Sequence, residues 1–176
     1  MNRLNYASFT LIVLIALVAV LRIGHFLPYN FSPVIALCLM GGAYFTRRWM
    51  AFIFPASILL ISDLVIGMGR PVEMLGVYGS YLLVILLGLR LHNKVKALPV
   101  IAISLSSSIV FYIITNFACW YGSSFYTQDL NGLIFCYNSA LPFFRTSLIS
   151  DLFFCGVFFT AFEAIRVKFP KFALVK

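Results

Sequence analysis

The sequence predicts an all-α integral membrane protein, organised as a single transmembrane domain over residues 1–176 that crosses the bilayer six times. The chain is 62% hydrophobic and only 10% charged, with a mean hydropathy of +1.02, which lies outside the range of soluble domains. Apolar runs of bilayer-spanning length recur along it, separated by short polar or basic breaks. These runs are continuously apolar rather than alternating, which argues against a transmembrane β-barrel.

The six predicted spans are bounded by polar residues, and they cover residues 7–21, 32–45, 49–66, 72–89, 97–120 and 143–165. The first span follows Arg3 as a secretory signal would, but no small-x-small cleavage site precedes Arg22, so we expect it to be retained. The second is short for a crossing, and we expect it to be tilted or partly re-entrant. Residues 121–142 are expected to form a long outer connection.

The distribution of Lys and Arg predicts the orientation of the chain. Of the 13 basic residues, three fall on one side of the predicted topology, namely Arg22, Arg70 and Arg145. The remainder fall on the other side: Arg3, Arg47, Arg48, Arg90, Lys94, Lys96, Arg166, Lys168, Lys171 and Lys176. Positive residues favour the cytoplasm, so both termini are predicted to be cytoplasmic in a bacterial plasma (inner) membrane. The formal charge of +8 therefore reflects topology, and we expect a lipid bilayer rather than nucleic acid as the partner.

A pentapeptide, LISDL, occurs at residues 60–64 and again at 148–152, and each copy places an aspartate inside an apolar run. An ionisable side chain at such depth costs several kcal/mol unless it faces a cavity or a partner, and it commonly marks a functional site. The two spans are antiparallel in the predicted topology, so Asp63 and Asp151 should lie at one depth in the outer third of the membrane. The alternative is a structural role as a cap or an interhelical hydrogen bond.

Further polar and aromatic side chains gather on the same outer side, where they suit a pocket for a small amphiphilic molecule. Together with the two aspartates, the predicted substrate-binding residues are Asn30, Asn116, Trp120, Tyr137, Asn138 and Arg145. Arg145 either pairs with Asp63 across helices or binds an anionic group of the ligand. The competing interpretation is an aromatic belt with charges that extend to the interface, as in any membrane protein.

The sequence lacks the motifs that mark several classes of enzyme and metal site. The chain has no GxxxxGK[ST] phosphate loop, no HExxH or paired Cys/His metal spacing, and no GxSxG elbow. We therefore predict a protein that is not an enzyme and that needs no cofactor or metal.

Cysteines and glycines give two structural expectations. Cys119 and Cys136 both map to the outer side, where they either form a disulfide or remain free thiols. The small residues Gly41 and Gly42 predict a close helix contact at the inner end of the second span.

Four stretches, NFSPVIALCLMGGAYF, SDLVIG, ITNFACW and YNSALPFFRTSLISDLFF, occur in this order from about Arg22 onward. With them the chain resembles an uncharacterised bacterial family of small membrane proteins described as transport proteins. That family is similar to the S components of energy-coupling-factor vitamin transporters. The resemblance implies a six-helix bundle with cytoplasmic termini and a vitamin-sized ligand bound from outside.

One feature departs from the S-component pattern. S components usually carry an AxxxA motif in the first span for contact with a coupling subunit, whereas this chain has Ala16 and Ala19 there. The departure favours a solitary transporter or a different energising membrane partner.

The function predicted from these observations is uptake of a vitamin-like small molecule captured from the outer side. The alternative is a non-transporting membrane scaffold or assembly subunit that acts through its basic cytoplasmic connections.

Overall fold

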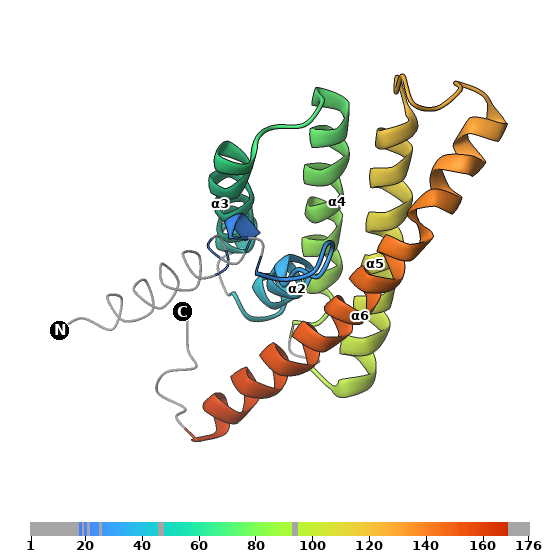
Figure 1. Ribbon diagram of the computed structural model, residues 1–176. Coiled ribbons are helices and arrows are strands. Elements are labelled where there is room, and N and C mark those ends of the chain that lie inside the picture. Colours follow the sequence, from blue (N-terminus) through green and yellow to red (C-terminus); the bar gives the residue numbers. More distant parts are fainter. Residues whose placement is uncertain are drawn as a thin grey trace.

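The computed structural model describes residues 18, 20, 22–24, 26–45, 48–92 and 95–168, with the side chains of residues 165 and 166 excepted. These residues form five helices, numbered α2 to α6 along the chain (Figure 1). Their bounds are Val34–Tyr44 for α2, Arg48–Ile66 for α3, Pro71–Leu89 for α4, Ala97–Trp120 for α5 and Leu130–Lys168 for α6. The predicted first span, residues 7–21, lies outside the described residues except for residues 18 and 20.

Four of the helices, α3 to α6, are long and apolar enough to cross a membrane. Continuous apolar sequence of this length is the pattern of a transmembrane helix, so the prediction of a membrane protein built of helices is supported. The bounds of α3, α4 and α5 agree with the predicted spans to within one residue. Among the described residues, four helices are of spanning length, and the predicted first span lies outside this part of the chain.

Helix α2 replaces the predicted second span and is only 11 residues long. At 1.5 Å per residue it extends about 16 Å, roughly half of the hydrocarbon core of a bilayer. Nine of its residues are buried, because α2 packs against α3, α4, α5 and α6 (Figure 1). Its uniform hydrophobicity therefore reflects a position inside the bundle, with protein on all sides.

Glycines set the distance between α2 and α4, as predicted for Gly42. A Cβ on Gly42 would lie 2.6 Å from the carbonyl carbon of Gly88, and one on Gly88 would lie 2.8 Å from the carbonyl oxygen of Leu39. The two backbones are in contact here, so neither position can accept a side chain without movement of a helix. This crossing fixes α2 against α4.

The prediction for the last helix was wrong at its first residue: α6 begins at Leu130 rather than at residue 143, and extends over 39 residues. Pro142, which we expected just before the helix, lies within it. The carboxylate of Asp129 accepts a hydrogen bond from the backbone N–H of Gly132 at 2.8 Å and caps the first turn. The expected outer connection is therefore half helix, and only residues 121–129 join α5 to α6.

We call the end of the bundle that contains residues 67–70 and 121–129 the upper end, which lies at the top of Figure 1. Arg70 joins two helices there. Its guanidinium donates to the backbone oxygens of Cys119 at 2.6 Å and Tyr121 at 3.2 Å, and pairs with Glu73 at 2.9 Å. Arg70 thus satisfies carbonyl groups at the end of α5 that the helix itself leaves without partners.

Candidate functional site

A cavity of about 560 Å³ lies between residues 27–33, the segment just before α2, and the facing sides of α4, α5 and α6. Its wall is mainly aromatic and aliphatic, with a few polar groups. The lining residues are Arg22, Leu27, Pro28, Tyr29, Asn30, Phe31, Ser32, Pro33, Ile35, Ile66, Val77, Tyr81, Phe111, Ser147 and Asp151. Tyr29 and Ile66 are 84% and 45% exposed, so they form the rim where the cavity meets the surface.

Serine side chains on α6 hold the segment that closes one side of the cavity. The backbone N–H of Ser32 donates to Ser150 Oγ at 2.8 Å, and Ser150 Oγ lies 3.1 Å from the Ser32 oxygen. Ser147 Oγ donates to the backbone oxygen of Asn30 at 3.3 Å. Asn30 adopts a positive φ of 60°, a conformation that asparagine tolerates better than most residues, so its position in the turn has a structural cause.

The first LISDL aspartate, Asp63, is paired. Its Oδ1 lies 2.9 Å from Arg22 Nη2, and its Oδ2 accepts a hydrogen bond from the Tyr78 hydroxyl at 3.1 Å. The Asp63 side chain is 10% exposed and that of Arg22 is 24% exposed, so most of the ion pair is shielded from solvent. The cost of placing Asp63 in an apolar helix is therefore offset by a cation and a hydroxyl.

The second aspartate, Asp151, has a neutral partner. Its Oδ2 accepts a hydrogen bond of 2.6 Å from Ser108 Oγ on α5, and the residue is only 3% exposed. Neither the Arg22–Asp63 pair nor the Arg70–Glu73 pair involves Asp151, and no Lys, Arg or His nitrogen in the described part of the chain lies within 4.0 Å of it. Asp151 is thus a buried carboxyl group on the cavity wall, and no cation of the described residues is paired with it.

The two aspartates do not share a hydrogen-bond partner, but they belong to one neighbourhood. Asp151 lines the cavity directly, whereas Asp63 reaches it through Arg22, which is also a lining residue. The Tyr81 ring lines the same cavity and packs on Phe111 with ring centroids 4.9 Å apart. The two copies of the pentapeptide therefore flank the same cavity from α3 and α6.

Two polar atoms beside the cavity are buried without a hydrogen-bond partner: Arg22 Nη1 and Ser32 Oγ. Buried donors that lack a partner are uncommon, because each one loses its hydration without compensation. Both residues line the cavity, and both atoms can donate. The wall thus has unused hydrogen-bonding capacity for an acceptor group.

Of the eight predicted binding residues, Asn30 and Asp151 line this cavity and Asp63 supports its wall. Asn116 does not reach it, because its amide donates to the backbone oxygen of Tyr112 at 2.8 Å, within the same helix. Trp120 donates to the Thr127 oxygen at 2.8 Å and holds the 121–129 connection.

The other three predicted residues lie on the upper part of α6. The Tyr137 hydroxyl donates to the Ile113 oxygen at 2.5 Å, which ties the first turns of α6 to α5. Asn138 and Arg145 are exposed and do not line the cavity. Arg145 makes no ion pair with any described residue, and the expected pairing with Asp63 is made by Arg22 instead.

Cys119 and Cys136 are neighbours whose side chains interact, and both thiols are free. Cys136 Sγ also lies 3.6 Å from the Asn116 backbone oxygen. The two residues thus face each other across the α5–α6 contact near the upper end.

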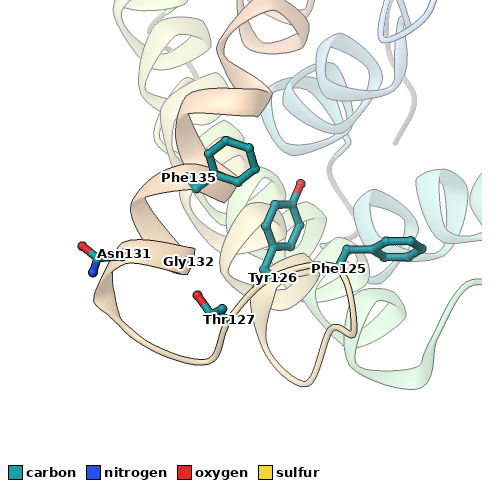
Figure 2. A pocket seen from close by; sticks show the side chains of 6 residues that line it. All are labelled: Phe125, Tyr126, Thr127, Asn131, Gly132 and Phe135. Carbon is teal, nitrogen blue, oxygen red and sulfur yellow. The ribbon is translucent and has the colours of Figure 1, made fainter.

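A second hollow, of about 380 Å³, lies between the 121–129 connection and the first turns of α6 (Figure 2). Its lining is Phe125, Tyr126, Thr127, Asn131, Gly132 and Phe135, and it contains no charged side chain. The rings of Tyr126 and Phe135 pack edge to face here with centroids 6.0 Å apart. This hollow offers apolar contact but few groups that would orient a ligand.

Several lining residues of the main cavity were not among the predicted binding residues, notably Arg22, Tyr81 and Phe111, and neither was Ser108, which donates to Asp151. Arg22 had a recognisable signal, since a cation just after an apolar run is a natural partner for a carboxylate in another helix. Tyr81 and Phe111 had none, because aromatic residues in apolar helices occur throughout this sequence.

The helices and the cavity together define a small all-helical protein of the membrane type with a binding-sized cavity among its helices. The chain belongs to the family described as "Family of unknown function (DUF6580)", which matches residues 2–172. No curated protein and no solved structure matches the chain.

Proposed function

We propose that this protein is a membrane transport protein that binds a vitamin-sized small molecule from the outer side of a bacterial inner membrane for uptake. The observation that carries the proposal is the cavity of about 560 Å³ with two unpartnered donors, Arg22 Nη1 and Ser32 Oγ, at its wall. Small-molecule sites have volumes of about 300–1,000 Å³ and combine apolar walls with a few polar groups, as this cavity does.

The direction of uptake follows from the distribution of charge. Arg48, Arg90 and Lys96 lie at the ends of helices opposite the upper end, and basic residues favour the cytoplasmic side. The upper end, and with it the rim residue Ile66 at the end of α3, then faces outward. A ligand would enter past Tyr29 and Ile66 and contact Arg22 and Asp151 within the bundle.

We also propose that the bundle is of the S-component type, on the basis of the resemblance in the stretches from Arg22 onward. A small helical protein with no phosphate-binding loop needs another source of energy for accumulation, either an ion gradient or a coupling membrane subunit. The site chemistry supports binding rather than catalysis, because no Lys, Arg or His nitrogen of the described residues lies within 4.0 Å of Asp151, so the Ser108–Asp151 pair lacks the base that activates catalytic serines.

A matched pair of tryptophan substitutions on α4 tests the proposal. Val77 lines the cavity, whereas Leu75 is 74% exposed on the same helix. Cells that express the wild type, Val77→Trp or Leu75→Trp would be grown in complex medium, and their small molecules compared by untargeted mass spectrometry. We expect one compound to accumulate with the wild type and Leu75→Trp but not with Val77→Trp.

The same experiment distinguishes uptake from a scaffold role. Thermal unfolding and membrane abundance of both variants establish that each is folded before accumulation is compared. If no compound depends on the wild-type protein while charge reversal of Arg48 and Lys96 abolishes its cellular role, the protein is a scaffold and the transport proposal is wrong.

A further inference from the structure

We infer that the molecule bound in this cavity carries a cationic nitrogen, and that Asp151 is its counter-ion. The inference rests on the proposed function, since it assigns a chemical class to the ligand of the same cavity. It follows from the charges that surround the cavity and from how each is neutralised.

The charges on the cavity wall do not balance. Arg22 is committed to Asp63 through a contact of 2.9 Å, and that pair is neutral as a unit. Asp151, on the other side, is bonded only to the Ser108 hydroxyl at 2.6 Å. Among the described residues, the wall therefore presents one carboxyl group more than it has cations.

The position of Asp151 makes a missing cation costly. The residue is 3% exposed, the turn that follows it on α6 (residues 152–155) is apolar, and a hydroxyl offers a carboxylate much less stabilisation than a cation does. Intramembrane carboxylates pair with one another, with cations or with functional ligands. Among the described residues no cation is close enough to Asp151, so a ligand ammonium or a protonated ring nitrogen is the counter-charge that we infer for it.

The rest of the wall is consistent with an aromatic or amphiphilic amine. Tyr29, Phe31, Tyr81 and Phe111 line the cavity, and aromatic faces attract organic cations as well as apolar groups. The unpartnered Arg22 Nη1 favours an acceptor atom elsewhere on the same ligand. A molecule with a cationic nitrogen at one end and an acceptor oxygen at the other would use both.

Three probes of similar size and different charge test the inference. Binding of 3-phenylpropylamine, 3-phenylpropan-1-ol and 3-phenylpropionate to the purified full chain would be measured at neutral pH by calorimetry. We expect the amine to bind about tenfold more tightly than the alcohol, as a charge-assisted hydrogen bond predicts, and the propionate to bind most weakly. In Asp151→Asn, which keeps an oxygen for Ser108, the amine and the alcohol should bind about equally.

The outcomes separate this inference from the proposed function. Equal or tighter binding of the alcohol or the propionate to the wild type would overturn the inference, and a preference for the propionate would assign recognition to Arg22. If none of the probes binds, the inference is tested on the compound that co-purifies with the wild type. A compound without a basic nitrogen overturns the inference but leaves the transport proposal standing. A wild type that binds no probe and contains no compound contradicts both. Should Asp151→Asn fail to fold, the ranking of the probes on the wild type is sufficient.

Discussion

Arg22 and Asp63 are 41 positions apart in sequence, and their side chains meet at 2.9 Å to form an ion pair that is mostly shielded from solvent. The pair links the segment before α2 to α3, and the Tyr78 hydroxyl adds α4 to the same cluster. One wall of the cavity is therefore held by a charge pair, while Asp151 on the other wall has no such partner.

Removal of one member of this pair should destabilise the fold. In Asp63→Ala the Arg22 guanidinium loses its counter-charge inside the bundle, and we expect a loss of about 3 kcal/mol in the free energy of unfolding. Replacement of both partners by apolar residues, as in Arg22→Met with Asp63→Ala, should restore most of that loss. Denaturant unfolding of the single and double variants in detergent measures the coupling. Strict additivity of the two single effects would show that the residues do not interact.

The contact between α2 and α4 gives a second prediction, with a control on the same helix. Gly88→Ala places a methyl group 2.8 Å from the Leu39 oxygen and 2.9 Å from its Cα, both backbone atoms, so we expect a loss of about 1–3 kcal/mol. At Gly79 an added Cβ meets nothing within 4 Å, and Gly79→Ala should be neutral or stabilising by up to about 1 kcal/mol. Thermal unfolding of the two variants compares them directly. Similar stability in both would contradict the close approach of α2.

The cap of α6 predicts a dependence of stability on pH. The backbone N–H of Gly132, with a smaller effect from the Thr127 hydroxyl, holds the pKa of Asp129 below its ordinary value of 3.8. Because the pKa is lower in the folded state, the charged cap stabilises the protein above pH 3.8 and loses its effect as the pH falls through the folded pKa. Asn in place of Asp129 still caps the helix but does not titrate. The melting temperature of the wild type relative to Asp129→Asn should therefore fall on acidification from pH 5 toward pH 3. A constant difference over that range would mean that Asp129 does not cap the helix as a carboxylate.

The two thiols at the α5–α6 contact give a prediction about cross-linking. Cys119 and Cys136 are close enough to interact, so mild oxidation of the purified protein should join them. Mass spectrometry of unreduced peptides detects the bond, and Cys119→Ser is the matched control that must abolish it. Absence of the joined peptide after oxidation, with the Cys119 thiol still available to alkylating reagents, would contradict the proximity of the two side chains.

The helices could largely be predicted from the sequence, and the exceptions have physical causes. Continuous apolar runs identified α3, α4 and α5 to within one residue. The start of α6 was missed because residues 130–142 contain Asn131, Asn138 and Pro142, which resemble a connection. Contacts to α5, such as those of Tyr137, hold these residues in a helix despite their composition. Hydropathy likewise could not show that α2 is an interior helix, because burial in protein and burial in lipid favour the same residues.

The candidate site was predicted only in part, from charged, polar or aromatic side chains that lie within or beside an apolar run. Asp63 and Asp151 were identifiable on that basis, and both lie beside the cavity. Asn116 and Trp120 were predicted from the same kind of signal, but local backbone oxygens satisfy their hydrogen bonds. Which polar side chain bonds to its own helix and which faces a cavity depends on helix rotation, and a single sequence contains little information about that rotation.

The most direct test of the central claim is native mass spectrometry of the full chain released gently from its own membrane. The account predicts one small molecule bound per chain in the wild type and in Leu75→Trp, and none in Val77→Trp, where the new side chain fills the cavity. A wild type that carries only lipid, with a spectrum identical to that of folded Val77→Trp, would contradict the claim that this cavity is a binding site.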